Sequence, residues 1–320
     1  MVNKFLNNVN KGDNNWWRYL LTIIFSWGAS NIIAGLILAF GIIVYFISVG
    51  NFDINYIMGF IEGYDSNLIF LFILMFVTFL FSMAFLFMSV KFIHKRNFMS
   101  LVNVLEKYDE ISGKTISWIN RIRWKQISKG ALIWLAFLLV MEAISYLTAP
   151  SAYSLNFSMD NFYLIIILFI LAVPIQITFE ELFFRGYLNQ GLSLKIKSPI
   201  IIILISSIIF ALGHIANGGM EPIFMIENVL FTFVFGFILS IATLVDNGIE
   251  LAIGAHFINN FYAFLIHSSE GSLGSFQTLI QVNGGNPMLD FILSILVVLI
   301  FGVALFIYKK KEIIKVLTDK

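Results

Sequence analysis

Long apolar stretches separated by short polar segments dominate the pattern of this 320-residue chain. An α-helix rises 1.5 Å per residue, so about 20 apolar residues can cross the hydrocarbon core of a bilayer. The pattern predicts about eight membrane-spanning helices, at residues 19–48, 68–93, 131–149, 162–190, 199–216, 225–245, 251–267 and 289–308. The first stretch is long, so we expect it to tilt or to extend beyond the bilayer. Asp246, Asn247 and Gly248 lie between the sixth and seventh stretches and predict a tight helical hairpin.

One sizeable polar segment, residues 94–130, interrupts this pattern. Apolar residues such as Phe98 and Leu101 recur through it at helical spacing, and Trp118 and Trp124 are residues typical of a membrane interface. The segment is also rich in lysine and arginine. It therefore predicts a basic amphipathic helix that lies on the inner leaflet.

The composition places the chain in the membrane. Hydrophobic residues make up 59% of it and charged residues 12%, with a mean hydropathy of +0.89, whereas soluble chains are about 25% charged. A soluble globular domain is thereby excluded. The absence of cysteine excludes disulfides, thiolate catalysis and cysteine-ligated metal sites. The first apolar stretch is too long for a signal peptide, so we expect it to be retained.

The distribution of positive charge predicts the orientation. If the N-terminus is inside, the cytoplasmic segments are 1–18, 94–130, 190–198, 246–250 and 309–320. All 20 lysines and arginines lie in or beside these segments, and the outer loops carry only acidic or neutral residues. Cytoplasmic loops of membrane proteins are enriched in lysine and arginine. We therefore expect an all-α polytopic protein with both termini in the cytoplasm. The abundance of Asn, Ile and Lys is typical of a low-GC bacterium, so we expect a bacterial plasma membrane.

Ionisable side chains inside the apolar stretches are the candidates for chemistry. A charge at the bilayer centre costs about 2.5–3.5 kcal/mol even on lenient scales, so intramembrane ionisable residues are usually functional. Glu180 and Glu181 lie in the fourth stretch, His214 in the fifth and His256 in the seventh. Counting 1.5 Å per residue from the cytoplasmic ends puts them at compatible depths. They are predicted to share one site.

The two glutamates are predicted to have different roles. Adjacent helical residues diverge by about 100°, so Glu180 and Glu181 cannot face one small cavity equally. Arg185 lies four residues after Glu181, the spacing at which side chains on one helix face meet. A Glu181–Arg185 pair would leave Glu180 in a desolvated position that suits a general base. The structural alternative is a salt-bridge cluster of all three residues.

The remaining polar residues are candidate hydrogen-bond donors. His256 and Asn260 are four residues apart, share a helix face and could hold a developing oxyanion together. The structural alternatives are a hydrogen-bonded core histidine for His214 and an interhelical polar clasp for His256 and Asn260. Glu142, in the third stretch, is a further intramembrane carboxylate, for which a buried hydrogen-bonded role is favoured over a place in the same cavity.

Three ordered motifs carry a family resemblance. They are a Glu-Glu pair with arginine four residues after the second glutamate, then Phe-x-x-x-His, then His-x-x-x-Asn. The chain matches them with Glu180, Glu181, Arg185, Phe210, His214, His256 and Asn260. This order resembles the CPBP family of intramembrane proteases, which includes the type II CAAX prenyl endopeptidases and the bacterial Abi proteins associated with bacteriocin immunity. The resemblance covers roughly residues 162–267, within a predicted protease core at 131–320 that follows a two-span region at 1–130.

The resemblance implies hydrolysis of a peptide bond within the membrane. It implies that Glu180 and His214 activate water, that His256 and Asn260 stabilise the oxyanion, and that Glu181 and Arg185 support the site. A carboxylate base, an imidazole and two donors suffice for water attack on an amide without a serine or cysteine nucleophile. A mechanism without a metal or other cofactor is preferred because His-Glu-x-x-His is absent. The alternative is a zinc ion held by Glu180, His214 and His256.

The expected partners are membrane lipid and a peptide or protein substrate at the membrane, with no nucleic acid. The substrate alternatives are a prenylated protein and a bacteriocin-like peptide. The alternative function is a non-catalytic immunity or binding protein that uses the same polar cluster structurally. A transporter is disfavoured because related repeats and a spread of polar residues along a pathway are not evident.

Overall fold

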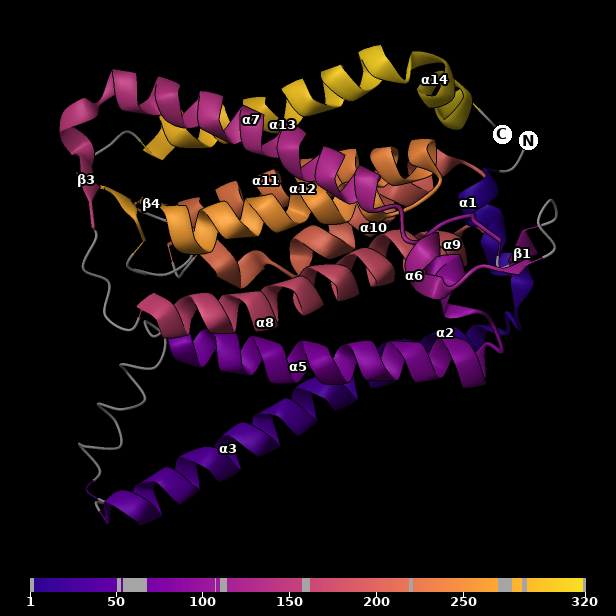
Figure 1. Cartoon of the computed structure of the whole chain (residues 1–320), viewed down its shortest axis with the longest axis horizontal. Coiled ribbons are helices and arrows are strands. Elements are labelled where there is room, and N and C mark those ends of the chain that lie inside the picture. The colour runs from indigo at the N-terminus through magenta and orange to yellow at the C-terminus, as the bar shows by residue number, and fades with distance from the viewer. Residues whose placement is uncertain are drawn as a thin grey trace.

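The computed structural model describes residues 3–50, 53, 68–106, 108–109, 114–156, 162–218, 221–269, 278–283 and 287–318. Regular structure in these residues is overwhelmingly helical, and the long helices run side by side as a bundle (Figure 1). The α-helices are α1 (Lys4–Asn7), α2 (Trp16–Ile23), α3 (Ser30–Val49), α5 (Leu68–Met88), α6 (Trp118–Arg121), α7 (Trp124–Thr148), α8 (Phe162–Glu180), α9 (Asn189–Leu192), α10 (Pro199–Leu212), α11 (Pro222–Asp246), α12 (Glu250–Phe261), α13 (Pro287–Tyr308) and α14 (Lys310–Thr318). The all-α polytopic fold predicted from the sequence is confirmed.

Wider and tighter turns connect or extend these helices. The π-helical turns are η2 (Ile24–Ala29), η3 (Ser89–Ile93), η6 (Glu181–Leu188) and η8 (Tyr262–Ile266), and the 3-10 turns are η1 (Asn8–Lys11), η4 (Phe98–Leu101), η5 (Pro150–Ala152) and η7 (Ile215–Gly218). Two of the π-helical turns, η6 and η8, continue α8 and α12, the helices that carry three of the four catalytic candidates. Single π-helical turns inside α-helices are frequent at functional sites.

Small strands complete the described structure. β1 (Tyr108–Asp109) and β2 (Lys114–Thr115) pair antiparallel. β3 (Tyr153–Leu155), β4 (His267–Ser269) and β5 (Ile280–Val282) form a sheet in the order β3-β5-β4, in which β5 is antiparallel to β3 and parallel to β4. β3 and β4 lie at the end of the bundle opposite the two chain termini (Figure 1).

Each of the eight predicted apolar stretches coincides with a helix. Six described helices are long and apolar enough to cross a membrane, namely Trp16–Val49, Ile69–Ile93, Trp124–Thr148, Tyr163–Leu192, Pro222–Asp246 and Met288–Val316. The other two, α10 and α12, have 14 and 12 residues and are shorter than a full crossing. The predicted hairpin between α11 and α12 is confirmed, because α11 ends at Asp246 and Asn247 adopts a left-handed conformation with φ of 55°.

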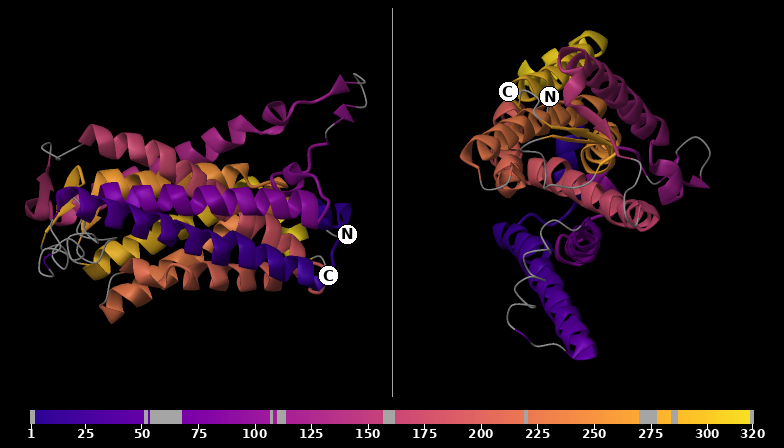
Figure 2. Two further views of the ribbon diagram at one scale, coloured as in Figure 1. Left: turned by 90° about the horizontal axis from the view of Figure 1, so that it is seen from below. Right: turned by 90° about the vertical axis from the view of Figure 1, so that its left-hand side faces the viewer.

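The arrangement in space separates one helix from the rest. Viewed along the bundle, α3 leans away from the other helices (Figure 2, right), and its packing partners are α5 and η2. The first and last described helices, α1 and α14, lie at the same end of the bundle (Figure 1). This placement agrees with two termini on one side of a membrane, while the cytoplasmic side itself stays a prediction.

The predicted amphipathic helix over residues 94–130 is wrong for the described part of that segment. Its described residues form η4, β1, β2, α6 and the first turns of α7. Most of the apolar side chains that suggested a helix pack against the protein: Leu101 and Val102 are buried in the main core, and Phe98 packs against it. The backbone is also tied to the α11–α12 turn, because Ile249 donates its N–H to the carbonyl of Val102 at 2.9 Å. These contacts join residues that are far apart in sequence, so they cannot be predicted from local periodicity.

A buried histidine ties the start of the bundle to η6. His94 donates from Nδ1 to the carbonyl of Asp13 at 2.8 Å and accepts the Tyr187 hydroxyl at Nε2, also at 2.8 Å. This pattern requires the neutral ring. Burial lowers the pKa of His94 to about 4, which keeps the ring neutral at pH 7. Tyr187 belongs to η6, so this clasp helps to fix the turn that carries Glu181 and Arg185.

Two glycines bring α7 and α12 into direct backbone contact. A Cβ atom added at Gly254 would overlap the carbonyl oxygen of Ile127, and one added at Gly130 would overlap the carbonyl oxygen of Leu251. Small residues at helix interfaces allow such close approach in membranes. The contact places α12, and with it His256 and Asn260, against α7.

The Gly254→Ala variant should therefore be destabilised. Overpacking a tight interface costs about 1–3 kcal/mol or more, and we expect a lower melting temperature of the detergent-solubilised protein. Gly41→Ala is the matched control, since a Cβ atom at Gly41 on α3 meets nothing within 4 Å. Equal melting temperatures for the two variants would contradict the close approach of α7 and α12.

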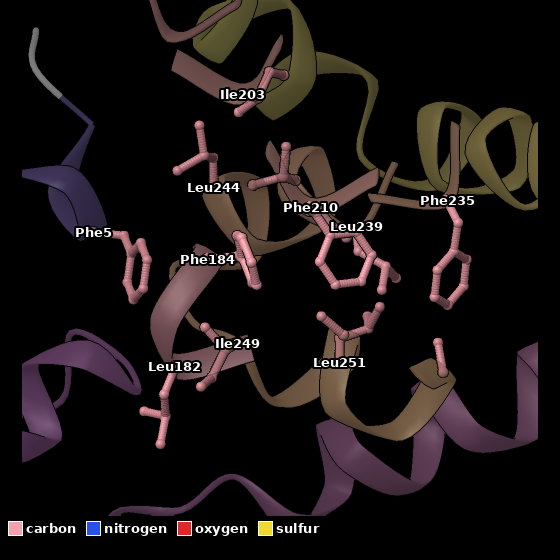
Figure 3. Packing of buried hydrophobic residues seen from close by; sticks show 14 of the residues in the cluster. Phe5, Leu182, Phe184, Ile203, Phe210, Phe235, Leu239, Leu244, Ile249 and Leu251 are labelled. Carbon is pink, nitrogen blue, oxygen red and sulfur yellow. The ribbon is translucent and has the colours of Figure 1, made fainter. Parts of the chain in front are cut away.

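The main hydrophobic core surrounds the intramembrane polar residues. Phe184, Phe210, Phe235, Leu239 and Leu251 come from η6, α10, α11 and α12 and converge in one cluster (Figure 3). The Phe184 and Phe210 rings meet edge to face, with centroids 5.0 Å apart. Phe235 and Phe210 also stand edge-on to a histidine ring, that of His256, at centroid distances of 5.5 and 6.1 Å. Aromatic packing therefore forms the wall against which the polar site is built.

Candidate active site

The Glu180–Glu181 pair lies at the junction of α8 and η6. Glu180 is the last residue of α8 and is 3% exposed, and Glu181 opens η6 and is fully buried. Pro174 lies inside α8, less than two turns before Glu180. The two carboxylates enter the core where the helix changes from α to π geometry.

The Glu181 carboxylate accepts hydrogen bonds from two side chains, those of Arg185 and His256. Its Oε1 accepts Arg185 Nη1 at 3.0 Å, so the predicted pairing across one turn is observed. The same oxygen accepts His256 Nδ1 at 2.7 Å, a contact that the sequence analysis did not foresee. Arg185 is buried, donates also to the carbonyl of Gly236 at 3.4 Å and stacks over the Phe210 ring at 4.2 Å. Glu181 thus links α12 to η6.

Glu180 turns to a different set of groups. Its Oε1 accepts Gln176 Nε2 at 3.0 Å. Its Oε2 lies 3.8 Å from His214 Nε2 and 3.7 Å from His256 Nε2, and within the described chain no protein donor lies within hydrogen-bond distance of it. Glu181 Oε2 also lacks a donor in the described structure, but Glu180 Oε2 is the one that faces two imidazoles.

His214 lies in a turn, beyond the helix in which the sequence analysis placed it. The prediction extended the helix from 199 to 216, but α10 ends at Leu212. The His214 Nδ1 donates to the carbonyl of Phe210 at 2.7 Å, and the His214 carbonyl accepts Asn228 Nδ2 from α11. A carbonyl oxygen only accepts, so Nδ1 carries a proton, which leaves the lone pair of Nε2 facing Glu180 when the ring is neutral.

His256 and Asn260 project from one face of α12 as predicted. They are 3% and 9% exposed and border the same cavity. Asn260 donates from Nδ2 to Gln176 Oε1 at 3.3 Å. The His256 ring stands between the two glutamates, with Nδ1 toward Glu181 and Nε2 toward Glu180. Both carboxylates approach His256, and they differ in their other partners, Arg185 for Glu181 and Gln176 for Glu180.

Gln176 is the residue of the site that sequence reasoning missed. It lies on α8 one turn before Glu180 and is 9% exposed. The available signal was an amide inside an apolar stretch, four residues from a carboxylate, a spacing at which side chains meet. It falls outside the three motifs.

A cavity of about 300 Å³ adjoins this cluster. Gln176, His214, His256 and Asn260 line one part, and aromatic side chains of α7, α10 and α11 line much of the wall, including Trp134, Phe210, Phe231 and Phe235. Glu142 lines it as well and binds the Tyr262 hydroxyl and His267 Nδ1, the latter at 3.0 Å. Glu142 is therefore both hydrogen-bonded and part of the same cavity.

The fold and this site define a helical membrane protein with a buried cluster of Glu, His and Asn side chains beside a cavity of about 300 Å³. Residues 161–262 match the family model of the Rce1-like type II CAAX prenyl endopeptidases. The matched segment contains all three motifs. The family resemblance predicted from the sequence is confirmed.

A curated relative extends the likeness over the whole chain. It is a Bacillus subtilis (strain 168) protein described as uncharacterized protein YyaK, 27% identical over 314 residues, which cover 97% of this chain and 98% of the relative. No solved structure matches the chain.

Proposed function

We propose that the protein is an intramembrane endopeptidase that hydrolyses a peptide bond with water activated by Glu180 and His214. The observation that carries this proposal is the buried Oε2 of Glu180, which has no protein donor and faces the Nε2 atoms of two cavity-lining residues, His214 and His256, at 3.8 and 3.7 Å. The match to the prenyl endopeptidase family supports it.

The geometry suits water activation. A water molecule beside the gap of 3.8 Å between Glu180 Oε2 and His214 Nε2 can donate one hydrogen bond to each. Its oxygen then attacks the carbonyl carbon of the scissile bond while one proton passes to Glu180. The same proton goes to the leaving nitrogen when the carbon–nitrogen bond breaks. The Glu180 carboxylate and the His214 imidazole thus act as hydrogen-bond acceptors for the same attacking water molecule.

His256 and Asn260 are the proposed oxyanion donors. Because His256 Nδ1 already donates to Glu181, its Nε2 can donate only when the ring is an imidazolium. Glu181 and Glu180 flank the ring on both sides and stabilise that charge. With Arg185 and His256 positive and both glutamates negative, the four groups carry no net charge. Asn260 adds an uncharged donor from the next turn of α12.

The described residues do not fit a zinc site as they are arranged. Zinc ligands at about 2.0–2.2 Å in tetrahedral geometry lie about 3.4 Å apart, and the Glu180–histidine separations are longer. Within the described ranges, no three His, Asp or Glu side chains form a group that could hold a metal ion. The proposed mechanism uses the protein's own side chains, and no step in it requires a metal.

The substrate is proposed to be a membrane-proximal peptide, either carrying a C-terminal lipid or resembling a bacteriocin. The test is incubation of the purified, detergent-solubilised protein with a mixed library of lipidated and unlipidated peptides, analysed by mass spectrometry. Discrete products in one peptide class are expected. Peptides that bind without being cleaved would instead favour a non-catalytic immunity or binding protein built on the same cluster.

Asn260→Ala should slow turnover by about 10²–10³-fold, the typical effect of removing one oxyanion donor. Substrate affinity should change little, because the interaction forms mainly in the transition state. Asn31→Ala is the control, since Asn31 on α3 is exposed and donates to the carbonyl of Trp27 in the preceding turn, η2. A steady-state analysis in which Asn260→Ala raises KM and leaves kcat unchanged would assign Asn260 to substrate binding instead.

A further inference from the structure

Gln176 connects the two halves of the proposed machinery. It is 9% exposed, lines the cavity and contacts both Glu180 and Asn260 through the two ends of its side-chain amide. Glu180 is the last residue of α8 and Asn260 lies on α12, so the contact bridges two helices. The family motifs do not include this residue.

The orientation of the Gln176 amide follows from the charge of the Glu180 carboxylate. Glu180, when ionised, only accepts hydrogen bonds, so the amide of Gln176 must turn its nitrogen toward Oε1, at 3.0 Å. The oxygen of Gln176 then points to Asn260. An oxygen needs a donor, and Asn260 presents Nδ2 at 3.3 Å. The charge of Glu180 therefore sets the orientation of the Asn260 amide through Gln176.

This orientation matters for an oxyanion. The Nδ2 group of Asn260 has two hydrogens, and one is used by Gln176, which leaves the other to donate elsewhere. Asn260 Oδ1 accepts Asn259 Nδ2 at 3.4 Å, which favours the same orientation. Rotating the amide by 180° would place an oxygen where a negative charge develops and would be repulsive. The occupied Oε1 of Glu180 also keeps its Oε2 directed at the histidines.

We propose that Gln176 is a positioning residue that orients the Glu180 carboxylate and fixes the Asn260 amide with its nitrogen toward the reacting carbonyl. The inference rests on the proposed peptidase function and extends it to a residue outside the motifs. Gln176 borders the cavity, and in this scheme it acts through its two neighbours.

The main test is Gln176→Met, which keeps the length of the side chain and removes its polarity. We expect kcat to fall about 10–100-fold with KM changed by less than about twofold, because misplaced groups act on the transition state. Asn260→Ala in the Gln176→Met background should then cost less than about tenfold, against 10²–10³-fold in the wild type. Multiplicative effects of the two substitutions, or a Gln176→Met variant with wild-type kcat, would overturn the proposal.

The control is Gln190→Met. Gln190 lies on α9, is fully buried and donates to the carbonyl of Ser100 at 2.9 Å, away from the cavity. A similar change in kcat for both glutamine variants would show a general effect of removing a buried amide and would also overturn the positioning role.

A second measurement works without substrate. Melting temperatures of the wild type, Gln176→Met, Asn260→Ala and the double variant form a cycle that detects direct contact. Non-additive shifts are expected for the bridge, and additive shifts would overturn it. Absence of cleavage by the wild type would refute the proposed function, while this cycle would still decide whether the bridge exists.

Discussion

Replacing Glu180 by alanine is expected to remove peptide cleavage while the protein remains folded. General acid–base catalysis contributes about 10²–10⁴-fold, so the residual rate of Glu180→Ala should fall at or below the limit of detection. The fold should survive because Glu180 makes one protein hydrogen bond, to Gln176, and keeps Oε2 without a donor in the described structure. Cleavage rate and melting temperature, measured on the same preparation, check both parts.

Two further variants sharpen this prediction. Glu180→Gln preserves the shape of the side chain but cannot accept a proton, so it should be as inactive as Glu180→Ala. Glu106→Gln is the matched control, because Glu106 is an exposed carboxylate paired with Lys11 at 2.8 Å. Retention of more than about a tenth of the wild-type rate by Glu180→Gln would show that another group is the general base.

Glu181→Ala is expected to damage the fold as well as activity. It leaves Arg185 buried without its carboxylate, and breaking a buried ion pair from one side costs about 3–5 kcal/mol. It also removes the acceptor of His256 Nδ1. Equilibrium unfolding of the detergent-solubilised variant should show a loss of this size. If Glu181→Ala were as stable as the wild type, the assignment of different roles to the two glutamates would be wrong.

A double variant distinguishes the effect of an unpaired buried charge from the effect of altered packing. Substituting both partners, Glu181→Leu with Arg185→Met, removes the buried charges together and should recover most of the lost stability, since apolar replacements of buried pairs are often neutral or stabilising. Activity should stay absent, because His256 still lacks its acceptor. Failure of the double variant to recover stability would attribute the loss to the shape of η6 instead of the uncompensated charge.

Much of the fold could be predicted because a membrane-spanning helix needs an apolar stretch of a given length, which the local sequence shows. Helices α5, α7 and α13 follow from apolar length, and the turn at Asn247 follows from polar residues between two apolar stretches. The segment at 94–130 could not be predicted, because its apolar residues pack against distant parts of the chain, as the bond between Val102 and Ile249 shows. Periodicity indicates that a face is buried, but not what buries it.

In the candidate site, too, the local contacts could be predicted and the long-range contacts could not. The pairing of Glu181 with Arg185 was predictable from spacing within one helix. The bond from His256 to Glu181 joins residues 75 apart, and only the packing of α12 against α8 reveals it. His214 was placed inside a helix because its neighbours are apolar, whereas its ring caps the carbonyl of Phe210 after the helix ends.

The most direct test of the central claim is cleavage of a susceptible peptide by the wild type and by Glu180→Ala, each with and without a strong zinc chelator. The proposed mechanism predicts wild-type cleavage that is unchanged by the chelator and absent in Glu180→Ala under both conditions. Cleavage that is lost on chelation and restored by added zinc would contradict the metal-free mechanism. Equal cleavage by the two proteins would contradict the role of Glu180 itself.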